Sequence, residues 1–344
     1  WGTRCAGVLD RISAHTPRDE VLVGLQAARE VDADLLVSLG GGSIIDACKV
    51  IQLAIDQEIH SEEALVEYAQ RSDGSRGSKA GDYSLFSEHS KIRQIAVPTT
   101  LSGAEFSNNA GVLDRSRSAK EGYRGTDLCP QCIIYDPELA VHTPQWLWLS
   151  TAIRSLDHAI EGFCSPETNP FLDGHFLHAM KLFAESLPLT RADSHDLHAR
   201  TLNQQAVWLA CCGLGTFVHG ASHGIGYILG SLCGVPHGHT SCVMLPAVLQ
   251  WNAEQFADQQ DPIIQALGNS GNRPEQGSET SAGAAVKSLV GKLGLPTTLK
   301  QVGVNPDQLN EIADRAIQHP VVRSNPRKLE SAEQVREILE LAWN

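Results

Sequence analysis

Histidine, arginine and tyrosine side chains that could carry out acid–base or metal chemistry concentrate in the second half of the 344-residue sequence. Arg154 and His158 stand four residues apart, a spacing that places both on one face of a helix. Four further histidines occur between residues 219 and 239, interleaved with glycines and Tyr227. Glycines let a backbone approach a ligand closely. A lone histidine is more often packed or solvent-exposed, but this density favours a functional site.

The imidazoles of this segment have the chemistry of metal ligands. Neutral imidazole binds zinc or ferrous iron, and three such ligands leave positions open for water or substrate. The same groups also act as general acids and bases near neutral pH. The histidines alone therefore leave two kinds of site open, a metal centre and a proton-transfer site.

The strongest local motif is Leu39-Gly40-Gly41-Gly42-Ser43, which joins an apolar run to a helical pattern. Backbone N–H groups at such a helix start, aided by the helix dipole, form a site for a pyrophosphate. The motif is neither G-x-G-x-x-G nor a P-loop, and a tight strand–helix turn needs no ligand. A second polar turn, Pro98-Thr99-Thr100, also follows an apolar run. Because ligands gather at the carboxyl ends of parallel strands, the two turns predict a nucleotide site, although either threonine could simply be a helix N-cap.

The composition excludes several classes of function. A formal net charge of −13 argues against a nucleic-acid or anionic-membrane partner, since both need a basic face. No run approaches the roughly 18 to 20 apolar residues that span a bilayer. Nine cysteines in a chain of this size, with no secretory signal, indicate reduced thiols rather than a disulfide framework. We therefore expect a cytoplasmic protein that acts on a small molecule.

Strand and helix patterns alternate in the first part of the chain. Strands are predicted at 34–39, 93–97 and 131–135, and helices at 20–31 and 44–55. This alternation indicates parallel pairing in an α/β layer architecture. The continuous apolar run at 34–39 predicts a strand buried on both faces. Polar residues at 70–90 predict a surface loop.

After about residue 144 the strand patterns almost vanish. Apolar residues recur at three- and four-residue spacing over 146–163, 171–185, 196–218 and 282–293, which predicts helices. The polar stretch 269–281 predicts a loop. We expect two domains, an α/β domain at 1–144 and an all-helical domain at 145–344.

These features occur together, in this order, in the iron-containing (group III) alcohol dehydrogenase superfamily, which includes the maleylacetate reductases and is related to dehydroquinate synthase. The sequence resembles this superfamily over essentially its whole length. The resemblance rests on Gly40-Gly41-Gly42-Ser43 with Asp46 and Lys49, Pro98-Thr99-Thr100 with Gly103 and Glu105, Tyr135-Asp136-Pro137, His158-Ala159-Ile160-Glu161, Val235-Pro236-His237-Gly238 and Leu245-Pro246. It implies a dinucleotide-binding α/β domain, a helical substrate and catalytic domain, and a cleft between them in which hydride is transferred.

The cofactor that the resemblance implies is NAD or NADP. The residues implied to bind it are Gly40, Gly41, Gly42, Ser43, Asp46, Thr99, Thr100 and Lys120. Family members begin with roughly one more βα segment, so the resemblance implies that an N-terminal βα segment is absent here. That segment usually distinguishes NAD from NADP, and the choice therefore stays open. The resemblance also implies a homodimer.

Position 154 departs from the pattern of the metal-dependent members. They bind their ion with an aspartate, a histidine four residues later and two further histidines fourteen residues apart. His158, His223 and His237 match these histidines, whereas Arg154 stands at the aspartate position. Two unit charges about 4 Å apart repel by about 4 kcal/mol at an effective dielectric constant of about 20, and a dication doubles this. The similarity to maleylacetate reductases, which do without the ion, implies that no iron or zinc binds; a metal, if present, would use these three histidines.

The function implied by the resemblance is NAD(P)H-dependent reduction of a carbonyl, in an oxo acid or aldehyde, by hydride transfer. Arg154 would polarise the carbonyl or bind a substrate carboxylate. His223 or His237 would give a proton to the alkoxide, with Tyr227 as competitor and His158 completing the site. Three alternatives stay open: an ion pair of Arg154 with Asp157 or Glu161, a metal-dependent alcohol dehydrogenase with a three-histidine site, and a non-redox biosynthetic enzyme on the same fold.

Overall fold

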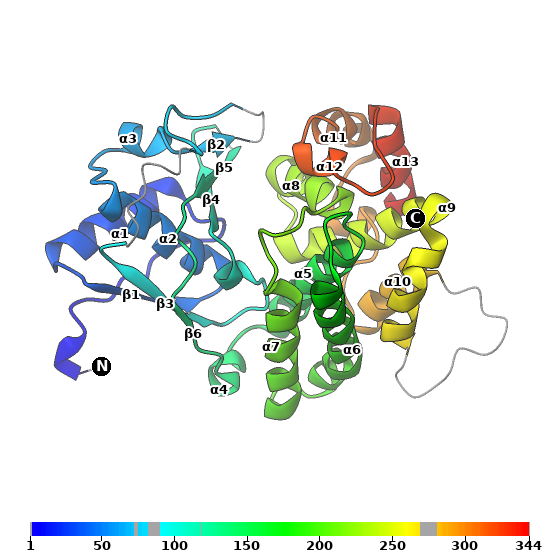
Figure 1. Ribbon diagram of the computed structural model, residues 1–344, viewed down its shortest axis with the longest axis horizontal. Coiled ribbons are helices and arrows are strands. Elements are labelled where there is room, and N and C mark those ends of the chain that lie inside the picture. The colour runs from blue at the N-terminus through cyan, green and yellow to red at the C-terminus, as the bar shows by residue number, and fades with distance from the viewer. Residues whose placement is uncertain (1, 72–74, 82–89, 118, 269–280, 344) are drawn as a thin grey trace. The chain divides into compact units, whose positions relative to one another are not determined.

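The structure, a computed structural model, describes residues 2–71, 75–81, 90–117, 119–268 and 281–343. The chain divides into two compact units (Figure 1). One consists of Trp1–Thr99 and Gly103–Asp136, and the other of Thr100–Ser102 and Pro137–Asn344. The predicted loops at 70–90 and 269–281 lie partly outside the described residues.

The first unit contains a parallel sheet, as the alternating pattern predicts. β1 (Leu35–Gly40), β3 (Arg93–Pro98) and β6 (Cys132–Ile133) pair in the order β1-β3-β6. α1 (Arg18–Glu30) packs on α2 (Gly42–Asp56), which contacts β1 and β3. Their apolar faces form a core that includes Val21, Leu25, Val50 and Leu53. The loops that follow β1 and β3 therefore lie at the same edge of the sheet.

β1 is not buried on both faces, and this part of the prediction is wrong. Leu35, Val37 and Leu39 share one face of the strand and are 38%, 38% and 56% exposed. Ser38, on the other face, is fully buried. Within the described residues β1 pairs with β3 alone, so it is an edge strand. An apolar run cannot reveal whether anything covers its second face.

A second, antiparallel sheet was not predicted. β2 (Gln70–Arg71), β5 (Ala119–Arg124) and β4 (Asn109–Asp114) pair in the order β2-β5-β4. α3 (Glu62–Val66) and the short 3-10 helices η1 (Gly2–Arg4) and η3 (Ala104–Phe106) complete the unit. Arg18 holds this sheet to α1 by donating to buried Glu121 at 2.6 Å. Because charged Asp114 and Glu121 occupy buried positions beside apolar Val112 and Tyr123, the apolar alternation in these strands is interrupted.

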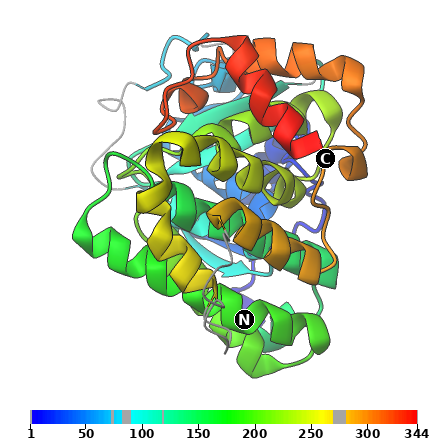
Figure 2. The same ribbon diagram turned by 90° about the vertical axis from the view of Figure 1, so that its right-hand side faces the viewer.

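Among its described residues the second unit contains helices joined by loops and no strand, which confirms the predicted fold class. Its helices are α4 (Pro137–Ala140), α5 (Gln145–Phe163), α6 (Pro170–Ala192), α7 (Leu197–Cys211), α8 (Ala221–Cys233), α9 (His237–Gly268), α10 (Ala282–Lys292), α11 (Leu309–Ala316), α12 (Pro320–Arg323) and α13 (Ala332–Trp343), with 3-10 turns η4 (Lys300–Val302) and η5 (Pro306–Gln308). They are coloured green to red in Figure 2.

α5 is the central helix of this unit. Every residue from Trp148 to Gly162 is buried, and α5 packs against α6, α7, α8 and α9. A helix buried on all sides directs its polar side chains at other helices rather than at water. The polar residues of α5 must therefore find partners inside the protein.

Two helices end at positions other than those predicted. The pattern at 196–218 is helical only to Cys211, and the chain then turns through Gly215, whose φ of +95° is left-handed. The helix predicted at 171–185 continues to Ala192 and includes Pro188. None of the helices in the described parts of the chain is long and apolar enough to cross a membrane.

Candidate active site

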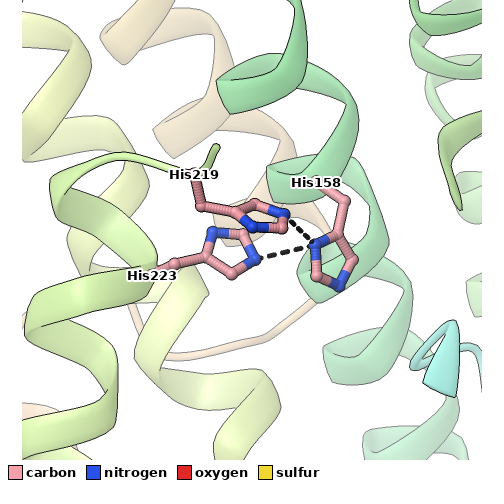
Figure 3. A group of neighbouring side chains, drawn as sticks. All are labelled: His158, His219 and His223. Atoms are coloured by element: carbon pink, nitrogen blue, oxygen red, sulfur yellow. Dashed lines mark hydrogen bonds between the residues drawn. The ribbon is translucent and has the colours of Figure 1, made fainter. Parts of the chain in front are cut away.

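Three imidazole rings converge inside the helical unit (Figure 3). His158 lies on α5, His223 in the first turn of α8, and His219 just before α8. Nδ1 of His158 lies 2.8 Å from Nε2 of His223 and 2.8 Å from Nε2 of His219. The rings of His219 and His223 stack with their centroids 4.0 Å apart. Both contacts end on Nδ1 of His158. Because a ring nitrogen has either one proton or one lone pair, it makes a normal hydrogen bond to only one of the two rings at a time.

Two carboxylates of α5 hold His223 in place. Nδ1 of His223 lies 2.7 Å from Oε2 of Glu161 and 3.4 Å from Oδ2 of Asp157. The same oxygen of Asp157 accepts from the hydroxyl groups of Ser222 at 2.7 Å and Ser241 at 2.6 Å. All five residues are buried. A polar network therefore joins α5, α8 and α9 in the interior of the unit.

Arg154 belongs to the same buried network. Its side chain is only 2% exposed, and Nη1 donates to Oγ of Ser241 at 3.1 Å. Nη1 also lies 3.9 Å from Oδ2 of Asp157. On its other side, Cζ lies 5.5 Å from the ring centroid of Tyr227, a cation–π contact. The ion pair with Asp157 that the sequence left open is thus present as a long contact, and the guanidinium also faces an aromatic ring.

Tyr227 connects this network to His237. Their rings stack 20° from parallel with centroids 5.9 Å apart, and the ring of His319 lies 5.4 Å from Tyr227. His237 is not part of the cluster of ring nitrogens, where His219 stands beside His158 and His223 instead. The grouping of histidines in the structure therefore differs from the one expected from family spacing.

Burial sets the protonation states of these groups. Burial lowers the pKa of His158 and that of His219 well below the usual value, and the positive charge of Arg154 lowers both further. Burial raises the pKa of Tyr227, although Arg154 opposes the shift. At neutral pH His158 and His219 are therefore neutral imidazoles and Tyr227 is a protonated phenol.

The ring nitrogens can be tested against a metal ion. One nitrogen from each of His158, His219 and His223 lies within 4.8 Å of the others, and a carboxylate behind a histidine is common in metal sites. Nitrogens bound tetrahedrally at about 2.1 Å from an ion lie roughly 3.4 Å apart. The two contacts of 2.8 Å are shorter than this. The three nitrogens converge as ligands of an ion would, and a bound ion would require the rings to lie slightly farther apart than they do here.

The glycine loop stands at the carboxyl end of β1, in the α/β unit. β1 and β3 pair in register to their last residues, and the N–H of Thr99 donates to the carbonyl of Gly40 at 2.9 Å. α2 then begins after Gly41 with no side-chain cap. Within the described ranges, no acceptor takes the N–H groups of Gly42 and Ser43. Open N–H groups at a helix start are what a phosphate requires.

Asp46 and Lys120 lie close to this loop but have structural contacts. Oδ2 of Asp46 accepts from the N–H of Gly111 in β4 at 2.9 Å, and Oδ1 lies 3.6 Å from Nζ of Lys49. Lys120 lies across Gly111, where a Cβ would come within 2.4 Å of its Cε. Asp46 therefore ties α2 to β4.

Ser43 and Thr100 also have partners. Oγ of Ser43 accepts from the N–H of His15 at 3.1 Å, and its carbonyl accepts from Thr16 at 3.0 Å. His15 and Thr16 both have left-handed φ values, of 67° and 57°. Oγ1 of Thr100 lies 3.4 Å from Oγ of Ser102. No pattern in the sequence singles out His15, because its contact is made by the backbone.

Sequence reasoning also missed several members of the buried network. These are His219 as a partner of His158, the carboxylates of Asp157 and Glu161 as partners of His223, and the hydroxyl groups of Ser222 and Ser241. The only usable signal was the four-residue spacing of the two carboxylates on one helix face. It shows that they lie together but not what they hold.

Two family models match the chain. One described as iron-containing alcohol dehydrogenase matches residues 1–137, and one described as the C-terminal part of the Fe-containing alcohol dehydrogenase family matches residues 148–343. This chain therefore belongs to the iron-containing alcohol dehydrogenase family and is an oxidoreductase.

Within that family the chain is similar to maleylacetate reductases. Maleylacetate reductase 1 of Cupriavidus pinatubonensis is 26% identical over 96% of this chain and 79% of its own length. Dehydrogenase FUM7 of Gibberella moniliformis is 30% identical over 98% of this chain and 84% of its own. The crystal structure of maleylacetate reductase from Agrobacterium tumefaciens matches with a TM-score of 0.79 and 26% identity, over 98% of this chain and 82% of that one.

Proposed function

We propose that this chain uses NADH or NADPH to reduce the carbonyl group of a small, carboxylate-bearing substrate such as an oxo acid, without a bound metal ion. Its membership in a family of oxidoreductases and its similarity to maleylacetate reductases support the reaction class. The observation that carries the proposal is the buried guanidinium of Arg154, which contacts Asp157 on one side and Tyr227 on the other. It stands at the position of the aspartate ligand in the family pattern of metal-dependent members.

The start of α2 is the proposed site for the pyrophosphate of the cofactor. The open N–H groups of Gly42 and Ser43 support this, together with the positive end of the helix dipole. Thr99, at the end of the neighbouring strand, is the next contact along the sheet edge. Asp46 acts by holding α2 against β4. When bound, the reduced nicotinamide supplies the hydride.

Arg154 provides fixed positive charge near the reacting carbonyl. A guanidinium can stabilise the alkoxide as it develops, or bind a substrate carboxylate through two N–H groups. Ser241 and Asp157 hold Nη1, so packing fixes the orientation of the side chain. Because a guanidinium does not lose its proton in proteins, this charge is constant across the working pH range.

Tyr227 and His237 are the proposed proton donors. Burial raises the pKa of Tyr227, so the phenol keeps its proton until the alkoxide forms. His237 stacks on the tyrosine ring. His223, which the sequence also suggested, is fully buried, and both of its ring nitrogens are engaged by Glu161 and His158. We therefore assign it a supporting role.

Metal analysis of the purified protein, with turnover measured before and after treatment with a chelator, tests the metal-free mechanism. We expect no stoichiometric iron or zinc and unchanged turnover. Stoichiometric metal whose removal abolishes turnover would overturn the proposal. It would favour the second candidate, a metal-dependent alcohol dehydrogenase, which the convergence of His158, His219 and His223 supports.

Substitution of Arg154 tests its role at the substrate. Arg154→Ala should raise KM about 10- to 100-fold for an oxo acid, the loss expected for a charge-assisted hydrogen bond. The KM for an uncharged aldehyde should change much less, and Arg154→Lys should retain part of the preference for the acid. Equal changes for both substrates, with a loss of stability, would instead indicate that the residue serves only as the structural partner of Asp157.

Two further expectations can be checked directly. Titration with NADH and NADPH, followed by nicotinamide fluorescence, should show binding of at least one. Binding of neither would favour the non-redox enzyme that the sequence left open. The homodimer implied by the family resemblance stays a prediction, which sedimentation analysis would test.

A further inference from the structure

α8 begins without a cap of its own. The residue that precedes it is Gly220, and no side-chain cap from its own segment accepts from its first N–H groups. A helix leaves these N–H groups without acceptors inside the helix, and such groups need a partner when they are buried. Gly220, Ser222 and His223 are all buried.

Glu161, on α5, supplies the missing acceptors. Its Oε2 accepts from the N–H of Gly220 at 2.8 Å, and its Oε1 accepts from the N–H of Ser222 at 2.8 Å. The N–H of His223 lies 3.4 Å from Oε2. A carboxylate from another helix thus caps α8, and its charge complements the positive end of the helix dipole.

The same carboxylate also holds the ring of His223. Oε2 of Glu161 lies 2.7 Å from Nδ1. An ionised carboxylate only accepts hydrogen bonds, so this contact requires the proton to be on Nδ1. Nε2 of His223 then faces Nδ1 of His158 at 2.8 Å. One side chain therefore fixes both the backbone and the ring of His223.

The surroundings leave Glu161 little freedom to move. A Cβ at Gly220 would lie 3.0 Å from Oε1 of Glu161 and 2.9 Å from Oδ1 of Asn325. Asn325 itself accepts from the N–H of Ala221 at 3.2 Å. The rings of His223 and Tyr227 lie in a T-shaped arrangement, 72° from parallel with centroids 6.5 Å apart. His223 is therefore one of the side chains that pack beside the proposed proton donor.

We propose that Glu161 is a positioning residue that fixes the Nδ1–H tautomer of His223 and so directs Nε2 toward His158. The effect on the tautomer follows from the contacts of Glu161 alone. The effect of Glu161 on turnover rests on the proposed function, because Glu161 would act through the packing of His223 against Tyr227.

Glu161→Gln is the central variant. Glutamine has the same size, but its single carbonyl oxygen cannot serve all the N–H groups that the two carboxylate oxygens serve. Glu161→Asp retains the charge on a shorter side chain. Asp196→Asn is the matched control, because Asp196 caps α7 by accepting from the N–H of Ala199 at 2.9 Å, away from the histidine cluster.

Long-range proton–nitrogen NMR of the protein labelled with ¹⁵N-histidine reports which ring nitrogen carries the proton. The signals of His223 are assigned with His223→Gln. We expect the Nδ1–H form in the unaltered protein and in Asp196→Asn, and a shift toward the Nε2–H form in Glu161→Gln. An unchanged Nδ1–H form in Glu161→Gln would overturn the proposal, whatever the activity.

Kinetics supply the second readout. Glu161→Gln should lower kcat by up to about 100-fold, because a displacement of about 1 Å among the groups at a site can cost that much. KM should change little, Glu161→Asp should recover part of kcat, and Asp196→Asn should retain it. Equal losses in Glu161→Gln and Asp196→Asn, or a shifted tautomer with unchanged kcat, would overturn the positioning role. If the unaltered protein has no NAD(P)H-dependent activity, the proposed function fails and the tautomer measurement still stands.

Discussion

α2 and α8 both begin after a glycine that provides no cap, Gly41 in one helix and Gly220 in the other. At α8 the carboxylate of Glu161 accepts from the N–H groups at the buried start of the helix. At α2 the N–H groups of Gly42 and Ser43 find no acceptor among the residues that the structure describes. The same positive helix end is neutralised by the protein in one unit and left open in the other.

The difference shows what a glycine-rich helix start does and does not indicate. In both units the glycine leaves room for an anion to approach the N–H groups. The anion that binds at such a helix start is not encoded nearby. At α8 it is the carboxylate of Glu161, which lies 59 residues before Gly220. A glycine loop therefore predicts an anion site, and the distant partners decide whether a ligand can use it.

The largest expected effect comes from placing a carboxylate side chain at the start of α2. Gly41 has φ −81° and ψ −174°, a backbone conformation that Asp adopts readily. Gly41→Asp should weaken NAD(P)H binding about 100-fold, or about 2.7 kcal/mol, because its carboxylate repels the pyrophosphate and competes for the N–H groups. Fluorescence titration measures the Kd.

Gly41→Asn is the control for charge, because it offers a cap of the same size without the negative charge. It should weaken binding less than Gly41→Asp. An unchanged Kd in Gly41→Asp would show that the pyrophosphate does not bind at α2.

The second prediction disturbs the occupied site at α8. Gly220→Ala places a Cβ against Glu161 and Asn325 and should cost about 1–3 kcal/mol of unfolding free energy, as overpacking does. Gly230→Ala, later in α8, is the control because its Cβ would meet only the carbonyl of Val235, at 3.7 Å. Urea denaturation compares the two, and equal stabilities would contradict the close fit described for Glu161.

The third prediction concerns acid. Burial, followed by neighbouring positive charge, lowers the pKa of His158 well below the value of 6.5 expected in the unfolded chain. Between these two pKa values the unfolded chain binds a proton that the folded protein does not. Stability from this residue is therefore complete above pH 6.5 and declines below it, by up to about 1.4 kcal/mol per pH unit.

Hydrogen exchange measured at successively lower pH should reveal this decline first in α5 and α8, after correction for the intrinsic exchange rate. α2 should respond less, since it has no buried imidazole. His158→Gln should flatten the dependence, and an equal response of α2 and α8 would argue against the assignment.

The smallest expected effect is at Ser43. Ser43→Ala removes the Oγ that accepts from the N–H of His15 and should cost about 0.5–1 kcal/mol. It leaves the N–H groups of α2 in place, so the Kd of NAD(P)H should change little. A large loss of affinity would mean that the cofactor depends on this hydroxyl rather than on the backbone of α2.

The fold could be predicted to the extent that local patterns determine it. Apolar runs ended by glycine or proline correctly placed β1 and β3, and three- and four-residue spacing placed most of the helical unit. The sheet of β2, β4 and β5 was missed because Arg18 and Glu121 take part in holding it. The exposed face of β1 was missed because covering a face is a property of the whole fold.

The candidate site could be predicted less completely. The spacing of Arg154 and His158 correctly placed both on α5, inside one network. It could not show that His219 would meet His158 while His237 stacked on Tyr227, because tertiary packing selects among nearby histidines. The sequence offered Glu161 as part of a family motif and as a possible ion-pair partner of Arg154, whereas its partners in the folded chain are His223 and the N–H groups at the start of α8.

The cap provided by Glu161 also bears on how the helical unit assembles. α8 has 13 residues, and an isolated helix of that length is marginal in water. Its first turn is completed by a side chain that leaves the ribosome 59 residues earlier. α5 is therefore already synthesised when α8 emerges, so Glu161 can cap α8 as soon as that helix forms. In a fragment that starts after α5, the first turn of α8 would lack this cap and would fray from Gly220 onward.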